Sequence, residues 1–467
     1  MTGQAPAREA GPAWEDRLRM VQEAATTVNN VFLVLATSLA YCCLTIITTT
    51  DDKLVPNQAT APLPLIQTSV PITNFFLFAP IALIVVFGYL QLNLISFFRA
   101  ASRLPSTFPD GTPLPEKISQ WALSALLRHW QAGSSDSAGP MARGASWAAV
   151  TLLWVATPLV VLLLWVRYLP CHDRAGNLLL AALVLVTFAV AVLSFGATRR
   201  EFCFELPRPF FQQGKTKKIA AMMCTVVLIG TASIDTAGGG WLCMLLPARA
   251  DFADREVSSR PEKWDEKNPK EVRGAKLAEK NLAYANAGRA FLAHADFHDS
   301  WLNRANLRES NLRGADFSSA HFLDRNREDD ICKPEYLGDT FPLFQRAHME
   351  LAQFSDHAML CAVSFAFADL TDVRLEDATL THADFTYANL TRTHLRLADL
   401  RYARFDYATL VDTDFSGADL TCAEAKGAII NNVNATKATL AGLKNGSGAL
   451  VADGLAQPPC DVPGPKD

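Results

Sequence analysis

Residues 383–402 of this chain are ADFTY ANLTR THLRL ADLRY, four units of five residues with a large apolar residue in the middle place of each. The same spacing of five runs through residues 358–440. A helix repeats about every 3.6 residues and a strand every 2, so neither fits this period. The backbone must turn a corner within every unit so that the same positions always face a common core. The stretch therefore predicts a solenoid.

Two positions in each unit are expected to face inward, one large and one, two residues earlier, small. The large positions are Leu360, Phe365, Leu370, Leu375, Leu380, Phe385, Leu390, Leu395, Leu400, Phe405, Leu410, Phe415, Leu420, Ile430 and Leu440. The small positions are mostly Ala, with Val363, Val373, Thr393 and Thr413 as exceptions.

An earlier block of units, in a different register, places large residues every five positions from Leu277 to Phe322, with Ala287 as its weak member. We expect residues 323–346, which contain prolines and a charged run, to form a loop insertion. The repeat then resumes at Met349. These patterns place the solenoid at residues 274–440, a linker at 248–273 and a flexible tail at 441–467.

Units such as Ala295-Asp296-Phe297 and Ala418-Asp419-Leu420 resemble the pentapeptide-repeat family. The resemblance implies an all-β right-handed quadrilateral β-helix, with about four units per coil and both inward positions stacked inside. Residues twenty apart would then lie above one another at about 4.8 Å per step. The motif describes a core and implies no catalytic chemistry.

The first half of the chain predicts a membrane α-helical bundle of four or five spans. Residues 31–48, 74–98, 147–166 and 178–195 are each apolar and long enough to cross a bilayer, which takes about 20 helical residues. Residues 219–246 are less regular, because Asp235 and three glycines interrupt them. This segment either spans the membrane or forms a re-entrant hairpin.

Basic residues set the expected orientation. They concentrate in the second and fourth loops, whereas Lys53 is the only one between the first two spans. The positive-inside rule then places the N-terminal segment, residues 1–27, in the cytoplasm. If residues 219–246 span, the β-helix is periplasmic. Residues 48–52 and 167–173 resemble the multispan region of bacterial pentapeptide-repeat proteins, which implies the bacterial inner (cell) membrane.

The second loop carries an apolar stripe at helical spacing from Ile118 to Trp130. It predicts an amphipathic helix that either lies on the inner membrane surface or packs against the spans.

No phosphate loop, Gly-x-Ser-x-Gly or His-Glu-x-x-His motif occurs, so we expect no enzyme, no cofactor and no metal site. His172 and Asp173, beside Cys171, form either a charged turn or a ligand site. Cysteines 332, 361, 422 and 460 lie in or beyond the repeat. A disulfide among Cys332, Cys361, Cys422 and Cys460 depends on the redox compartment.

We consider one main function and two alternatives. The first is a membrane-anchored structural or protein-interaction module, whose partners are the lipid bilayer and an unidentified protein, with a homo-oligomer left open. The alternatives are a transport or sensing role of the membrane region, and the DNA mimicry of topoisomerase-binding relatives. Mimicry needs a strongly acidic rod. Residues 356–440 hold twelve acidic against seven basic residues, so the negative electrostatic field of the rod is weak. Neither DNA mimicry nor a nucleic-acid partner is therefore favoured.

One outward position is aromatic three times at intervals of twenty residues, in Phe367, Tyr387 and Tyr407. We expect these rings to form a column. Nearby charges complete a candidate partner-binding strip; they are Asp384, Arg404 and Asp406. The column either covers a corner of the coil or binds a partner.

Overall fold

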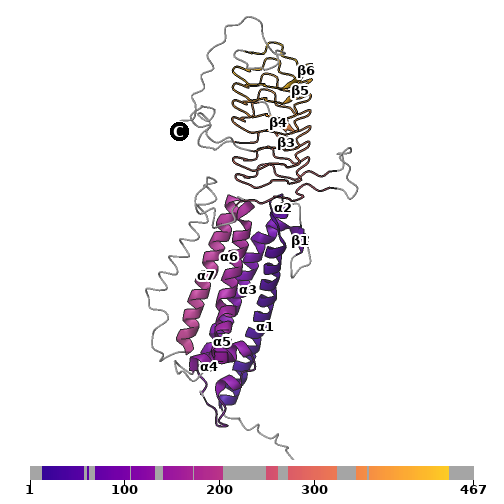
Figure 1. Ribbon diagram of the computed structural model, residues 1–467. Coiled ribbons are helices and arrows are strands. Elements are labelled where there is room, and N and C mark those ends of the chain that lie inside the picture. The colour runs from indigo at the N-terminus through magenta and orange to yellow at the C-terminus, as the bar shows by residue number, and fades with distance from the viewer. Residues whose placement is uncertain are drawn as a thin grey trace, which may run out of the picture. The chain divides into compact units, whose positions relative to one another are not determined.

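The computed structural model (Figure 1) divides the chain into two compact units. Unit 1 comprises residues 1–49, 61–168 and 173–235, and unit 2 comprises 50–60, 169–172 and 236–467. The structure describes residues 13–56, 60–62, 69–105, 107–131, 140–171, 173–202, 249–260, 272–322, 343–354 and 357–440. The proposed fifth span at 219–246 lies outside these residues.

Unit 1 is a bundle of long helices. Its main helices are α1 (Ala13–Thr48), α3 (Ile72–Ala101), α5 (Pro140–Val150), α6 (Ala156–Tyr168) and α7 (Arg174–Phe202). Among the residues that the structure describes, four helical segments are long and apolar enough to cross a membrane: Trp14–Thr48, Ile72–Ala101, Gly144–Cys171 and Ala175–Thr198. Four apolar helices were expected, and this expectation is confirmed. Residues 13–27, expected as a separate segment, continue the first helix.

Helix α3 packs against α1, α6 and α7 (Figure 1). It buries one apolar face that includes Phe75, Phe87 and Phe97, yet leaves Phe78 and Val85 largely exposed. A helix that is apolar on all sides suits burial on one side and lipid on the other.

The third apolar segment contains a π-helical turn, η2 (Thr151–Val155), between α5 and α6. Pro158, in α6, has no N–H to donate to the carbonyl four residues earlier, so the regular helix pattern fails here. Gln91 of α3 donates its Nε2–H to the Leu153 carbonyl at 2.8 Å. A buried amide thus satisfies a backbone acceptor in the irregular turn.

The expected amphipathic helix is α4 (Trp121–Gln131), which follows the short η1 (Leu114–Glu116). It packs against α5, burying Leu123, Leu126 and Leu127. Ser146 of the α5 segment donates to the Ala125 carbonyl at 3.1 Å. Packing against the bundle is therefore the alternative that its contacts favour.

Unit 2 is a coil of pentapeptides in which parallel pairing recurs every twenty residues. Ser364 pairs with Asp384, and Asp384 with Arg404, so four units complete one coil. Each side is too short for long strands, and most pairs are single bridges. The longer strands are β3 (Asp316–Phe317) with β4 (Gln353–Phe354), and β5 (Thr409–Val411) with β6 (Ile429–Asn431).

A separate two-stranded sheet pairs β1 (Thr60–Pro62) with β2 (Ser69–Pro71).

The corners explain the period of five. In one unit the Ala388 N–H bonds to the Phe385 carbonyl at 2.9 Å, which closes a β-turn. The third residue of that turn, Tyr387, has φ of 59°, as type II turns require. The same positive φ recurs at five-residue intervals, mostly at non-glycine residues. Those residues adopt it because hydrogen bonds to the coils on both sides hold the backbone there.

Both inward columns are buried. Leu390 is fully buried, and Phe344, Phe365, Phe385 and Phe405 stack with centroid distances of 5.2, 5.1 and 4.9 Å. The exceptional threonines at the small position have a structural reason. The Thr393 hydroxyl donates to the Leu370 carbonyl in the adjacent coil at 2.9 Å, and Thr413 bonds to Leu390 in the same way.

Two boundaries differ from those expected. Residues 249–260 fall in the range expected as linker, 248–273, but Asp251 pairs with Asn286, and Phe252 and Val257 are buried in the core. The repeat also resumes before residue 347, because Leu343 accepts a bond from Leu307 N–H and Phe344 is buried. Both stretches of repeat were missed in the sequence because each is short and lies beside a break in the period of five.

The N-terminal end of the β-helix is covered within unit 2 by α2 (Asp51–Leu54) and the residue that follows it. Val55 is 2% exposed and belongs to the β-helix core cluster. The Asp251 N–H donates to the Asp51 carboxylate at 2.7 Å. This short segment therefore closes an end that would otherwise expose core side chains.

Replacing Leu390 with Asp should destabilise the β-helix by several kcal/mol, because the carboxylate would lie inside a closed coil without a partner. Thr391→Val is the matched control: it removes a hydroxyl that donates to Asn389 Oδ1 at 2.6 Å, which should cost about 1 kcal/mol. Urea unfolding of the full chain in detergent, followed by proteolysis of the repeat, measures both. Equal midpoints for the two variants would contradict the inward assignment.

Candidate partner-binding corner of the β-helix

One corner of the coil forms a continuous column, which we call the corner column. The backbone N–H of each member except the last bonds to the carbonyl of the residue just before the next member in the sequence. The Tyr387 N–H, for example, bonds to the carbonyl of Asp406, which precedes Tyr407, and the Tyr407 N–H bonds to that of Lys426. Register alone therefore places these side chains above one another. The members are Asp254, Arg289, Glu309, Arg346, Phe367, Tyr387, Tyr407 and Gly427.

The aromatic part of the corner column is stacked, as the sequence predicted. Phe367 and Tyr387 have ring centroids 5.0 Å apart at 8°, and Tyr387 and Tyr407 are 5.0 Å apart at 10°. The three residues are 51%, 52% and 46% exposed. Free aromatic pairs prefer offset or edge-to-face packing, so the near-parallel stack reflects the coil spacing.

Gly427 ends the stack. A Cβ at this position would lie 2.7 Å from Cε1 of the Tyr407 ring, and its φ is 69°. The glycine thus accepts both the left-handed backbone and the close ring. At this end of the aromatic part, the Tyr407 ring packs against the backbone of Gly427.

The other half of the corner column is charged and was not foreseen. Arg289 makes a bidentate pair with Asp254 at 2.6 and 2.7 Å, and this hydrogen-bonded pairing lowers the pKa of Asp254. Arg346 lies 3.8 Å from Glu309, and its guanidinium lies 5.3 Å from the Phe367 centroid. Arg346 thus joins the charged part to the aromatic part by a cation–π contact.

The three flanking charges lie on the side of the coil that leads into this corner. Arg404 Nη2 is 3.0 Å from Asp406 Oδ2, and Asp406, which is buried, also accepts the Lys426 N–H at 3.0 Å. Asp384 accepts the Thr386 N–H at 3.1 Å. Asp406 and Asp384 are therefore occupied in holding the backbone, which leaves the rings as the more available surface.

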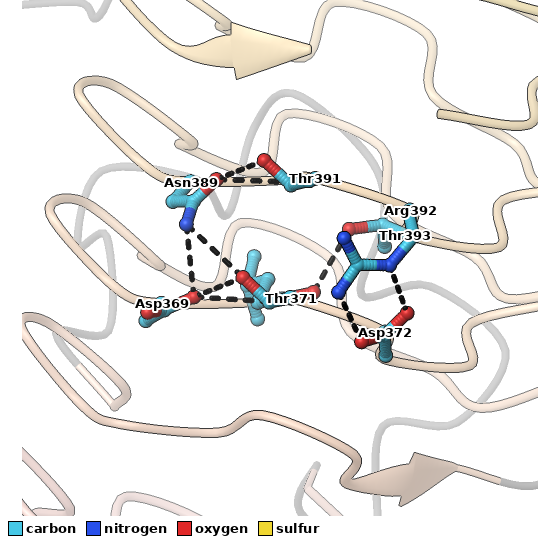
Figure 2. Close-up of polar contacts among 8 residues, drawn as sticks. Asp369, Thr371, Asp372, Asn389, Thr391, Arg392 and Thr393 are labelled. Atoms are coloured by element: carbon cyan, nitrogen blue, oxygen red, sulfur yellow. Dashed lines mark hydrogen bonds and ion pairs between the residues drawn. The ribbon is translucent and has the colours of Figure 1, made fainter. Parts of the chain in front are cut away.

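The next side and corner carry polar ladders (Figure 2). Asn389 Nδ2 donates to Asp369 Oδ1 at 3.2 Å and to Thr371 Oγ1 at 3.0 Å. Arg392 makes two bonds to Asp372 in the adjacent coil, at 2.7 and 2.6 Å, and this pairing lowers the pKa of Asp372. These donors and acceptors satisfy one another, in contrast to the aromatic faces of the corner column.

The contacts of Asp173 fit the charged-turn alternative. Asp173 accepts the N–H groups of Ala175 and Gly176, at 3.1 and 3.2 Å, as an N-cap of α7, and the Tyr168 hydroxyl at 2.8 Å. His172 lies outside the described residues. Within the described part of the chain, no group of three or more His, Cys, Asp or Glu side chains could hold a metal ion.

The described cysteines of the repeat differ from those of α1. Cys361 and Cys422 are each disulfide-bonded, whereas Cys42 and Cys43 are free. The first two lie three coils apart, about 14 Å at 4.8 Å per coil, and a disulfide needs Cα atoms within about 7 Å. They are therefore not bonded to each other. Cys332 and Cys460 lie outside the described residues.

Comparison with known proteins agrees with this geometry. A family model described as pentapeptide repeats matches eight copies at residues 290–322, 362–396 and 398–434. The β-helical unit is a pentapeptide-repeat domain. A search of curated proteins finds no match.

Solved pentapeptide-repeat structures resemble this chain over part of its length. HetL, involved in heterocyst differentiation regulation in the cyanobacterium Nostoc sp. strain PCC 7120, is 21% identical and has a TM-score of 0.24. Its match covers 37% of this chain and 77% of HetL. Rfr23 from the cyanobacterium Cyanothece 51142 is 19% identical over 32% of this chain and 88% of its own, with a TM-score of 0.16. QnrB1, a plasmid-mediated fluoroquinolone resistance protein, is 18% identical over 37% of this chain and 88% of its own, with a TM-score of 0.17.

His382 should make the domain sensitive to acid. Its ring stacks on Tyr402 with a centroid distance of 4.8 Å, and burial, followed by the charge of Arg401, lowers its pKa. The unfolded chain then binds the proton more readily, so stability is lost as pH falls through the ordinary value of about 6.5. Thermal unfolding at pH 7.5 and 5.5 should show a smaller acid loss for His382→Gln than for the unmodified chain. Identical losses would contradict a depressed pKa.

Proposed function

We propose that this chain is a membrane-anchored interaction module whose β-helix stands outside the cytoplasm and presents the aromatic part of the corner column to a protein partner. The observation that carries the proposal is the stack of three half-exposed rings, Phe367, Tyr387 and Tyr407.

The stack has the properties of an interface anchor. Aromatic residues supply much of the binding energy at protein interfaces. These rings are already held parallel by their neighbours, so they would lose little side-chain entropy when a partner binds. Arg346 adds a positive charge at one end of the stack. A partner with an apolar strip and an acidic group beside it would complement this surface.

Two loops support an extracytoplasmic β-helix. Residues 50–60 and 169–172 belong to the same compact unit as the repeat, and Val55 of the first loop packs in its core. The positive-inside rule assigns both loops to the side opposite the basic second and fourth loops. A repeat that incorporates these loops belongs on their side of the bilayer.

The cysteines give independent support. Disulfides form and persist in oxidising compartments and are rare in the cytosol. Both described cysteines of the repeat, Cys361 and Cys422, are disulfide-bonded. With the N-terminus and the end of α7 in the cytoplasm, the chain would then cross the membrane again between residues 203 and 248, where residues 219–246 supply an apolar segment.

Reporter fusions test the side of the membrane. Alkaline phosphatase, which is active only outside the cytoplasm, should be active after Leu440, and a fluorescent protein that folds only inside should be active at the N-terminus. Deleting residues 219–246 should reverse the first result and leave the second unchanged. An alkaline phosphatase that is inactive after Leu440 in the intact chain would refute the extracytoplasmic location.

Photocrosslinking tests the partner-binding surface. A photoreactive residue at Tyr387 in native membranes should give a specific adduct, because it would lie in the centre of the aromatic stack. Thr391 is the matched control on the next side of the same coil. Equal yields from the two positions, or no adduct from either, would leave the aromatic column with a structural role only.

A further inference from the structure

A buried polar site lies inside unit 1, at the π-helical turn η2 of the third apolar segment. Thr157, two residues after this turn, is fully buried at the middle of the segment Gly144–Cys171. Gln91 of α3 is 2% exposed and donates to the Leu153 carbonyl in the turn at 2.8 Å. Buried polar groups are costly unless they are hydrogen-bonded, and π-helical turns are frequent at functional sites. The turn is therefore a candidate binding site.

Thr157 differs from the buried threonines of α7. The hydroxyls of Thr187 and Thr198 donate to the carbonyl four residues earlier in the helix, at 2.6 and 2.7 Å. For Thr157 that carbonyl belongs to Leu153, which already accepts the Gln91 amide. Among the described residues, the Thr157 hydroxyl has no hydrogen-bond partner.

The Gln91 amide has an unused acceptor at the same place. A carbonyl oxygen only accepts, so the bond to Leu153 turns the NH2 group of the amide toward the turn. The amide oxygen, Oε1, is buried and has no hydrogen-bond partner among the described residues. Thr157 lies one helical turn after Leu153, on the same face of the segment. Both unpaired oxygens therefore belong to one site.

We propose that this site binds one water molecule, between Gln91 of α3 and Thr157 of α6. The water accepts a hydrogen bond from the Thr157 hydroxyl and donates one to Gln91 Oε1. Its second proton is donated to the Leu153 carbonyl, whose oxygen has a second lone pair. Three hydrogen bonds are typical of a buried water. The inference does not rest on the partner-binding role of the aromatic corner.

The number and charge of the polar groups select water over a divalent cation. Ca²⁺ takes about six to eight oxygen ligands, among them carboxylates, and Mg²⁺ takes about six. The described groups of this site are a hydroxyl, an amide oxygen and a backbone carbonyl, all of them uncharged. They can complete the hydrogen bonds of a water but not the coordination of such a cation.

Pro158 gives the water a structural role. Its ring nitrogen carries no hydrogen, so the preceding turn lacks one backbone hydrogen bond. In membrane-spanning helices, such gaps are filled by neighbouring helices, hydroxyl side chains or ordered water. Gln91 supplies the contact from a neighbouring helix, and the water links it to the Thr157 hydroxyl.

The direction of one stability change tests the site. Thr157→Val replaces the hydroxyl with a methyl group of similar size. With a bridging water, the variant leaves the water short of a partner, so the thermal unfolding midpoint of the full chain in detergent should fall by about 2–4 °C. A midpoint that rises or stays unchanged would overturn the inference, because removing a hydroxyl that bonds to nothing costs no hydrogen bond.

Two further variants separate the water from the loss of a hydroxyl. Thr187→Val is the matched control, and its midpoint should fall less, because the Thr187 hydroxyl bonds directly to the Leu183 carbonyl. In the background Gln91→Met, the variant Thr157→Val should lose most of its effect, since both residues share the water. An undiminished effect in that background contradicts the bridge.

Nuclear magnetic resonance tests for the water itself. In the full chain labelled with ¹⁵N-glutamine, the side-chain amide of Gln91 should show a cross-relaxation peak at the water frequency. Gln91 is 2% exposed, so bulk water is too distant to produce this peak. Thr157→Val should weaken or remove it. Its absence from the spectrum of the unmodified chain would overturn the inference whether or not the variants fold.

Discussion

The parallel hydrogen-bond register, offset by twenty residues, is the constraint on which the β-helix depends. It holds from Lys276 with Asp296 to Trp301 with His321, and again from Met359 with Thr379 to Asp419 with Thr439. Between these blocks the parallel pairing continues with other offsets, as in Asp316 with Gln353 and Gln353 with Arg374. Once this register is fixed, each side chain lies above or below the equivalent side chain of the adjacent coil. The offset between paired residues therefore determines which side chains are neighbours. The inner phenylalanine stack, the Asp–Asn ladder and the exposed aromatic stack are products of this register, with ring distances close to the coil spacing.

This register also gives the surface its functional potential. In most proteins, aligning three exposed aromatic rings would require several loops to be ordered. Here the backbone aligns them, and the charged part of the corner column joins the aromatic part at Arg346 without a break. Four described helices of unit 1 are long and apolar enough to cross a membrane. The membrane anchoring proposed above would raise the effective concentration of a partner held in the same membrane.

Much of this could be predicted from the sequence because a period of five leaves few alternatives. Leu390 and Phe385 were assigned inward, and Phe367, Tyr387 and Tyr407 to one column. Arg346 and Phe344 were missed because the insertion hides their register, and Phe252 because it stands apart from the main block. Contacts remote in sequence, such as Val55 in the β-helix core, leave no periodic signal. The hydroxyl bond of Thr391 to Asn389 depends on a rotamer, which spacing cannot give.

Disulfide trapping tests the register most directly. Residues one coil apart have Cα atoms about 4.8 Å apart, within the range that a disulfide bridges, whereas residues ten apart lie on opposite corners. The double variant Tyr387→Cys/Tyr407→Cys should therefore crosslink within the chain on mild oxidation, and Tyr387→Cys/Leu397→Cys should not. Peptide mapping distinguishes the new bond from the native ones. Crosslinking of the second pair in preference to the first would contradict a coil of four pentapeptides.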